Sequence, residues 1–142
     1  MSKQEKFAWV TFLVMVIGSA WLAWLLWSTW PDTATFREHE ALTRPLLWAV
    51  LLLCGAVTVA QLKWRPKEPF ADERDRAILH AGSLQGFATL ALMNVVLGIV
   101  IAANDGLLAR LDAVWMRYLL LLQVGVAFAV ASGYRIVRYR LG

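Results

Sequence analysis

The densest group of ionisable side chains in this chain is the run Asp-Glu-Arg-Asp-Arg at positions 72–76. Asp72 is a good helix N-cap, and acidic residues in the turn that follows suit the positive end of a helix dipole. Asp72 and Glu73 also precede Arg76 by four and three residues, which allows pairing on one side of a helix. The run therefore predicts a capped, charged first turn of a helix, suited to binding a partner. The candidate interaction residues are Asp72, Glu73, Arg74, Asp75 and Arg76.

A second group consists of polar side chains set within apolar sequence: His80, Ser83, Gln85, Asn94 and Gln123. An unpaired amide in hydrocarbon is costly, so Gln85 and Asn94 should face protein or water. His80 could act as a proton-sensitive switch or as a haem or metal ligand, although an interfacial histidine without a ligand role is the simpler interpretation. Together the five could line a small-molecule site or a permeation path.

Signatures of catalysis are missing from the sequence. It contains no Ser/His/Asp set, no metal-binding helix motif and no phosphate loop. His39 lies between Glu38 and Glu40, but three consecutive residues cannot all face one ion on a helix or strand. The single cysteine, Cys54, cannot support the paired-cysteine chemistry of thiol–disulfide oxidoreductases. We therefore expect a protein that is not an enzyme, with no catalytic residue, metal or cofactor.

The elements that carry these residues follow from hydropathy. Hydrophobic residues make up 60% of the 142 positions, against roughly 45–50% in soluble domains. Four runs without Asp, Glu, Lys or Arg have 25, 18, 28 and 17 residues: 7–31, 45–62, 77–104 and 118–134. A bilayer core needs roughly 20 helical residues, and backbone in hydrocarbon must satisfy its own hydrogen bonds. The prediction is an all-α integral membrane four-helix bundle of two antiparallel hairpins. It forms a single transmembrane domain over 1–142, with helices at 7–30, 45–63, 73–103 and 113–135.

Basic residues flank the predicted helices unequally. Ten of the 14 lie at the two chain ends and in the middle loop: Lys3, Lys6, Lys63, Arg65, Lys67, Arg74, Arg76, Arg135, Arg138 and Arg140. The other four lie in or near the two remaining loops: Arg37, Arg44, Arg110 and Arg117. The positive-inside rule then predicts that both termini and the middle loop are cytoplasmic, in a bacterial inner membrane. This distribution suits lipid headgroups better than nucleic acid. The expected partners are the bilayer and either another protein or a second copy of the chain.

Small residues recur every four positions on the last two predicted helices. Gly82 and Gly86 form such a pair on the third helix, and Gly125, Ala129 and Gly133 form a series on the fourth. Small residues at this spacing allow close backbone contact between membrane helices. We expect these two helices to pack together through these residues.

Four tryptophans recur every three residues near the end of the first predicted helix: Trp21, Trp24, Trp27 and Trp30. Residues three apart lie on adjacent positions of one side of a helix. The simpler interpretation is an interfacial aromatic belt. The alternative is an aromatic wall for a quinone or another flat ligand, as in a quinone- or haem-linked redox accessory subunit.

The stretch Phe-Ala-Asp-Glu-Arg-Asp-Arg-Ala-Ile at 70–78 resembles the Asp-Glu-Arg-(Asp/Glu)-x-x-Ile signature of a family of small, uncharacterised prokaryotic four-helix membrane proteins. The matching positions are Asp72, Glu73, Arg74, Asp75 and Ile78. In that family the signature joins helices two and three, and a Lys/Arg-Ala or Lys/Arg-Ser pair stands where this chain has His80-Ala81. The resemblance implies a membrane location and no activity. The function we expect is a regulatory, scaffolding or accessory subunit of the inner membrane that acts through its cytoplasmic segment 63–80.

Overall fold

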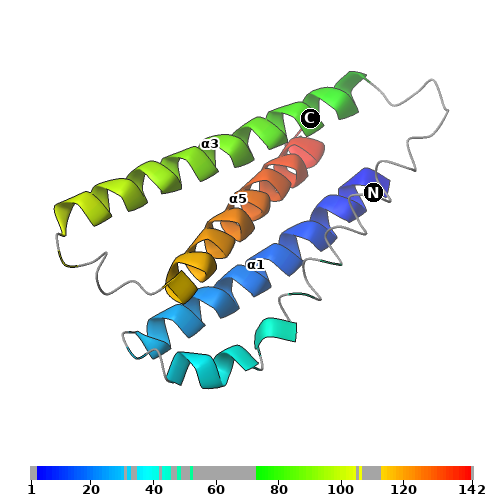
Figure 1. Cartoon of the computed structure of the whole chain (residues 1–142). Coiled ribbons are helices and arrows are strands. Elements are labelled where there is room, and N and C mark those ends of the chain that lie inside the picture. Colours follow the sequence, from blue (N-terminus) through cyan, green and yellow to red (C-terminus); the bar gives the residue numbers. More distant parts are fainter. Residues whose placement is uncertain are drawn as a thin grey trace.

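The fold is that of a computed structural model, which describes residues 3–30, 32, 35–41, 43–45, 48, 52, 73–104, 106 and 113–141. Within these residues the long elements are α1 (Lys3–Thr29), α3 (Glu73–Ala103) and α5 (Ala113–Leu141). Helix α5 lies between α1 and α3 and packs against both (Figure 1). Helices α1 and α3 run in the same general direction, and α5 runs against them. We call the end where α1 and α3 begin and α5 ends the polar end, and the opposite end the aromatic end.

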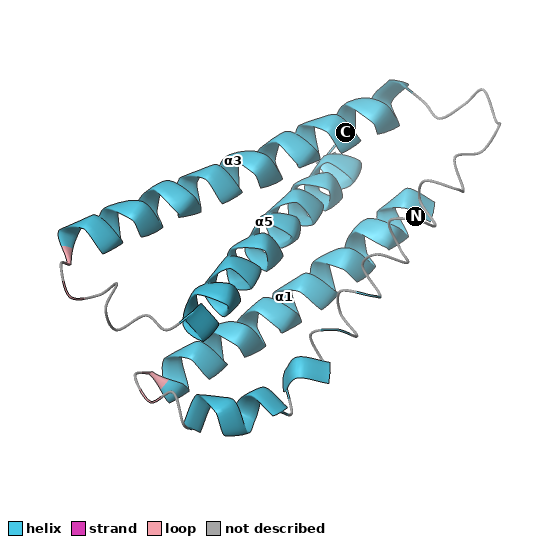
Figure 2. Cartoon of the chain, in the orientation of Figure 1, coloured by secondary structure: helices cyan, strands magenta, loops and turns pink. Residues whose placement is uncertain are grey.

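The predicted four-helix bundle of two antiparallel hairpins is wrong. In the part of the chain that the structure describes, the elements are all helical, as expected, but the long helices number three, with shorter helical stretches at 35–41 and 43–45, and the layout is not that of four helices. Among the described residues, every element is a helix (Figure 2). The second predicted helix, 45–63, lies almost entirely outside the described residues. The prediction failed because the length of an uncharged run shows only that a helix there could span a membrane. Capping and packing decide how the runs divide into helices.

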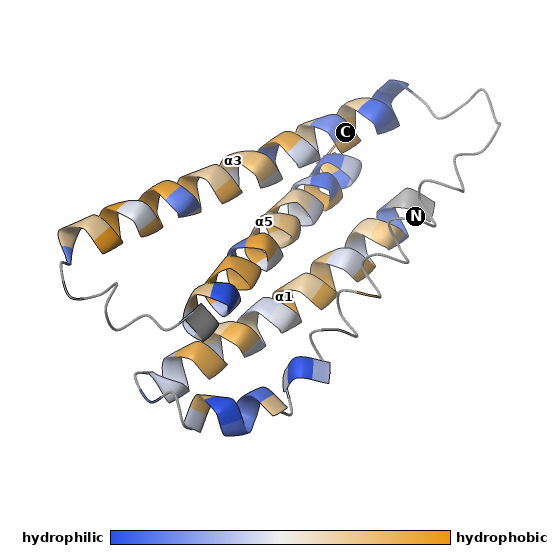
Figure 3. Ribbon diagram, viewed as in Figure 1, coloured by the Kyte–Doolittle hydropathy of each residue, from blue (hydrophilic) through white to orange (hydrophobic). Residues whose placement is uncertain are grey.

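Three of the described helices are long and apolar enough to cross a membrane: Glu5–Thr29, Glu73–Ala103 and Trp115–Leu141. Large hydrophobic side chains on them face outward, among them Ile17, Phe87 and Leu92 at 67%, 69% and 64% exposure. A soluble monomer rarely exposes so much contiguous apolar surface. Figure 3 shows mostly apolar residues along the three helices, with hydrophilic residues gathered where α1 and α3 begin and α5 ends. The chain is therefore a multi-pass membrane protein.

Charged residues shape the ends of the helices. Helix α1 begins four positions before the predicted residue 7, and Glu5 in its first turn suits the positive end of the helix dipole. Helix α5 continues to Leu141, beyond the predicted residue 135, with Arg138 and Arg140 at its negative end. Helix α3 covers the range predicted as 73–103. Charged turns thus extend α1 and α5 past the apolar runs from which their bounds were predicted.

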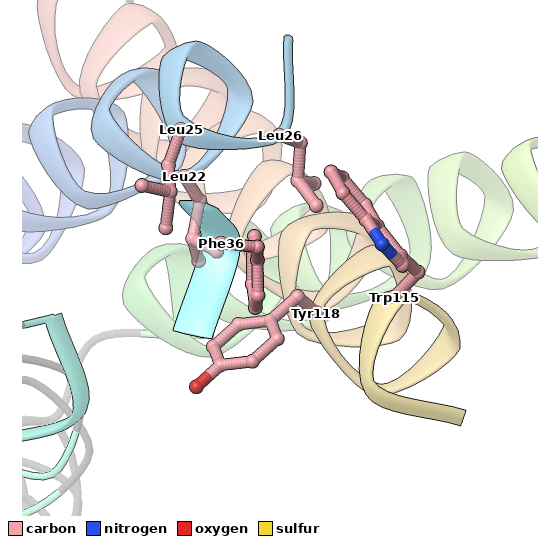
Figure 4. Close-up of a cluster of buried hydrophobic side chains, with 6 residues drawn as sticks. All are labelled: Leu22, Leu25, Leu26, Phe36, Trp115 and Tyr118. Atoms are coloured by element: carbon pink, nitrogen blue, oxygen red, sulfur yellow. The ribbon is translucent and has the colours of Figure 1, made fainter. Parts of the chain in front are cut away.

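The main buried cluster lies at the aromatic end and joins three parts of the chain (Figure 4). Its members are Leu22, Leu25 and Leu26 of α1, Phe36 of the helical segment 35–41, and Trp115 and Tyr118 of α5. The Phe36 ring lies 4.8 Å from the Trp115 ring and 5.0 Å from the Tyr118 ring, centroid to centroid. Helix α3 contributes no residue to this cluster in the part of the chain described. Its attachment to α5 must therefore be sought nearer the polar end.

Candidate functional site

Helix α3 meets α5 through glycine. A Cβ atom added to Gly86 would lie 2.9 Å from Ala131 Cβ and 3.0 Å from the Ala127 carbonyl oxygen. One added to Gly82 would lie 2.6 Å from Arg135 Cγ and 3.0 Å from the Ala131 carbonyl oxygen. These distances leave no room for a side chain, so the two backbones are in direct contact. The partners on α5 recur every four residues and form one face of that helix.

The small residues predicted on α5 pack elsewhere. A Cβ atom on Gly125 would lie 2.5 Å from Ser19 Oγ of α1, and one on Gly133 would lie 3.1 Å from the Phe12 ring of α1. Ala129 lines an apolar groove between α1 and α5. The expectation that α3 packs on this series was therefore wrong. Both series on α5 step by four residues, and the step alone does not reveal which helix lies against which face.

Arg135 lies on the same face of α5 as Ala127 and Ala131, the face that contacts α3. From the sequence we expected Arg135 only to contact lipid headgroups. Its Nη2 donates a 3.1 Å hydrogen bond to Ser83 Oγ, which in turn donates to the Leu79 carbonyl oxygen at 2.9 Å. Arg135 Nε is buried and has no hydrogen-bond partner in the described part of the protein. The signal for this role was the series 127, 131, 135 at steps of four, which places Arg135 in register with two alanines.

The last turns of α5 hold both neighbouring helices at the polar end. The Tyr139 hydroxyl hydrogen-bonds to the Asp75 carboxylate on α3. Arg140 Nε lies 3.9 Å from Glu5 Oε1 on α1, and its guanidinium carbon lies 5.3 Å from the centre of the Trp9 ring. The end of α5 thus fixes the starts of α1 and α3 relative to each other.

The charged first turn of α3 faces outward. Glu73, Arg74 and Arg76 are exposed, whereas Asp75 is partly buried and reaches Tyr139. Asp72 and the preceding residues of the 63–80 segment lie outside the described residues. Glu73 and Arg76, both described, form no ion pair with each other. The charges of these two residues are therefore directed to the surroundings of the helix.

The polar residues predicted inside the membrane do not converge. His80, Gln85 and Asn94 are exposed on α3, and Asn94 Nδ2 donates a 2.8 Å hydrogen bond to the Leu90 carbonyl oxygen of its own helix. Gln123 is 5% exposed on α5, and its Oε1 has no partner in the described structure. Among the described residues, Ser83 is the only one of the five that hydrogen-bonds to a side chain of another helix, namely Arg135 of α5. These side chains do not meet one another within the described part of a single chain, and a site or path lined by them stays a prediction.

The four tryptophans of α1 spiral around the helix. Three residues turn an α-helix by about 300°, so each tryptophan is displaced about 60° from the one before. The Trp21 and Trp24 rings are tilted to each other by 42° with centroids 5.3 Å apart, whereas Trp30 packs edge-on against Trp115 of α5 at 5.2 Å. Trp27 is 85% exposed. This arrangement does not form a flat wall for a quinone.

The described residues contain no group of three or more His, Cys, Asp or Glu side chains that could hold a metal ion.

The resemblance of 70–78 to a family signature stays a prediction. No protein-family model, curated protein or solved structure matches the chain.

Proposed function

We propose that this chain is a small, non-enzymatic membrane protein that serves as a regulatory, scaffolding or accessory subunit and binds a protein partner through the charged start of α3. The observation that carries the proposal is the exposure of Glu73, Arg74 and Arg76 on one helical turn. This turn combines both signs of charge, so it favours a partner with a complementary pattern.

The attachment of α3 to α5 supports this role. The glycine contact at Gly82 and Gly86 and the hydrogen bond between Tyr139 and Asp75 fix the start of α3 before any partner arrives. A surface that is already ordered loses less conformational entropy on binding. A fixed charged turn therefore suits specific docking better than a solvated loop with the same composition.

The polar end faces the cytoplasm of a bacterial inner membrane in this proposal. Among the described residues, the polar end carries Lys6, Arg74, Arg76, Arg135, Arg138 and Arg140. The described basic residues nearer the aromatic end are Arg37, Arg44 and Arg117. Basic residues concentrate on the cytoplasmic side of membrane helices, so this asymmetry favours a cytoplasmic polar end.

Site-specific photo-crosslinking in native membranes tests the docking proposal. A photoreactive residue is placed at Arg74 or at Arg76, and matched controls carry it at Glu38 or Arg44, which are also exposed. We expect one protein to be captured from positions 74 and 76 and not from the controls. The combined charge reversal Glu73→Lys/Arg76→Glu should then reduce that capture by about tenfold.

Two results would count against the proposal. Capture of the same protein from all four positions would indicate a non-specific membrane neighbour. An unchanged yield after charge reversal would show that the charges of α3 do not recognise the partner. Circular dichroism of each purified variant checks that its helices are retained.

A further inference from the structure

Arg135 lies in the contact between α3 and α5, and its guanidinium group is partly buried. Gly82 makes room for it, since a Cβ atom there would lie 2.7 Å from Arg135 Nε. The Nη2 group donates to Ser83 Oγ, a neutral acceptor. The buried Nε has no acceptor among the described residues. The guanidinium group is therefore held in one place with a donor left unused.

A counter-charge for Arg135 is missing from the described residues, where no carboxylate lies within ion-pair distance of it. Asp75, on the same helix contact, already accepts from Tyr139. Withdrawing a cation from water without a paired anion is energetically unfavourable. Arginine within a membrane helix therefore usually has an anionic or carbonyl partner.

The position of Arg135 near the end of α5 suits contact with lipid headgroups. It precedes the end of α5, Leu141, by six residues, or about 9 Å at 1.5 Å per residue. On α3, Arg76, His80 and Ser83 follow one another at steps of four and three, so they share one side of that helix, and all three are exposed. This side of α3 therefore carries two further donors, Arg76 and His80, on the turns before Ser83.

We propose that Arg135 binds the phosphodiester of an anionic phospholipid at the polar end of the α3–α5 contact. Ser83 positions the guanidinium group through its 3.1 Å hydrogen bond. Arg76 and His80 add positive charge or a donor along the same side of α3. The guanidinium fork matches phosphate oxygens, and basic pockets between membrane helices are known to hold anionic headgroups.

Native mass spectrometry of the full chain in a neutral detergent tests this site. Phosphatidylglycerol and phosphatidylcholine with identical acyl chains are titrated separately. We expect the wild type to bind one phosphatidylglycerol about tenfold more tightly than phosphatidylcholine, because the net negative headgroup gains a charge-assisted pair. Arg135→Gln should remove this preference, and Arg135→Lys should retain only part of it.

Arg138→Gln is the matched control. Arg138 is exposed on the same helix, and its Nε donates to the Tyr134 hydroxyl of that helix at 3.1 Å. The preference should change less than about twofold in this variant, because an exposed charge near the surface contributes little. An equal loss in both variants would indicate a diffuse charge effect and overturn the site.

The two lipid titrations of the wild type test the proposed site even if Arg135→Gln does not fold. Equal affinity of the wild type for the two lipids would refute the proposal. Inorganic phosphate is added in a third arm. If phosphate alone displaces phosphatidylglycerol from the wild type at millimolar concentration, the site takes free phosphate, and the lipid assignment is wrong. Arg76 belongs to both proposed surfaces, but the lipid test varies only Arg135 and Arg138, so its outcome can be told apart from that of partner capture by the first turn of α3.

Discussion

The hydroxyl of Tyr118 donates a 3.0 Å hydrogen bond to Oε1 of Glu40, and this bond joins α5 to the segment 35–41 across 78 positions of the chain. Tyr118 is only 3% exposed, and its ring packs against Phe36. The bond therefore lies at the edge of the aromatic cluster, where water competes little for the carboxylate. This hydrogen bond and the packing of the Phe36 ring both hold the segment against α5.

Tyr118→Phe should lower the free energy of unfolding by about 1–3 kcal/mol, since it removes a hydrogen bond to a charged acceptor and leaves the carboxylate without that donor. The measurement is equilibrium unfolding in a fixed detergent. Tyr134→Phe is the control, because the Tyr134 hydroxyl accepts an exposed bond from Arg138 of the same helix. That variant should lose no more than about 0.5 kcal/mol. Equal losses would mean that the Tyr118 bond contributes nothing beyond the general effect of a lost hydroxyl.

The position of α3 could be predicted from the sequence because it depends on local information. The uncharged run after Arg76 and the acidic turn before it together predict α3, and the all-helical class follows from the cost of unpaired backbone in hydrocarbon. The number of helices could not be predicted in this way. It depends on how each apolar run is interrupted, which hydropathy does not report.

The pairing of helix faces could not be predicted either. Gly125 and Ala127 both belong to series with a step of four, yet one faces α1 and the other faces α3. From the sequence, Arg135 was expected only to reach lipid headgroups with the other basic residues, and its contact with α3 was missed. Gly82 and Arg135 are 53 positions apart in the chain. Their contact depends on the register between α3 and α5, and a single sequence carries no direct record of that register.

Gly86→Ala should destabilise the protein by about 1–3 kcal/mol, because the added methyl group would meet a backbone oxygen and a methyl group that cannot move away. The relevant distances are 3.0 Å to the Ala127 carbonyl oxygen and 2.9 Å to Ala131 Cβ. Gly98→Ala is the matched control on the same helix, since nothing lies within 4 Å of its Cβ position. It should be neutral or stabilising by up to about 1 kcal/mol, because alanine favours the helix. Thermal unfolding in detergent measures both variants, and equal behaviour would contradict the α3–α5 contact.

Trp115→Ala should cost about 3–5 kcal/mol of the free energy of unfolding, because it empties the centre of the aromatic cluster. Trp115 is 2% exposed and lies against both Trp30 and Phe36. Trp27→Ala removes the same side chain from a position that is 85% exposed, and its cost should stay below about 1 kcal/mol. Unfolding in a denaturant series compares the two. A large loss from Trp27→Ala would show that this face of α1 is covered by another molecule.

Single-cysteine labelling should place the polar end in the cytoplasm. In a Cys54→Ser background, Glu38→Cys lies at the aromatic end and Arg76→Cys at the polar end, and both positions are exposed. A membrane-impermeant maleimide added to intact spheroplasts should label position 38 and leave position 76 unlabelled. Lysis should expose position 76 to the reagent, which controls for the reactivity of that thiol. The reverse pattern would put the basic end outside, against the positive-inside rule. Partner docking on the cytoplasmic side would then be excluded, whereas lipid binding at Arg135 would survive on the opposite leaflet.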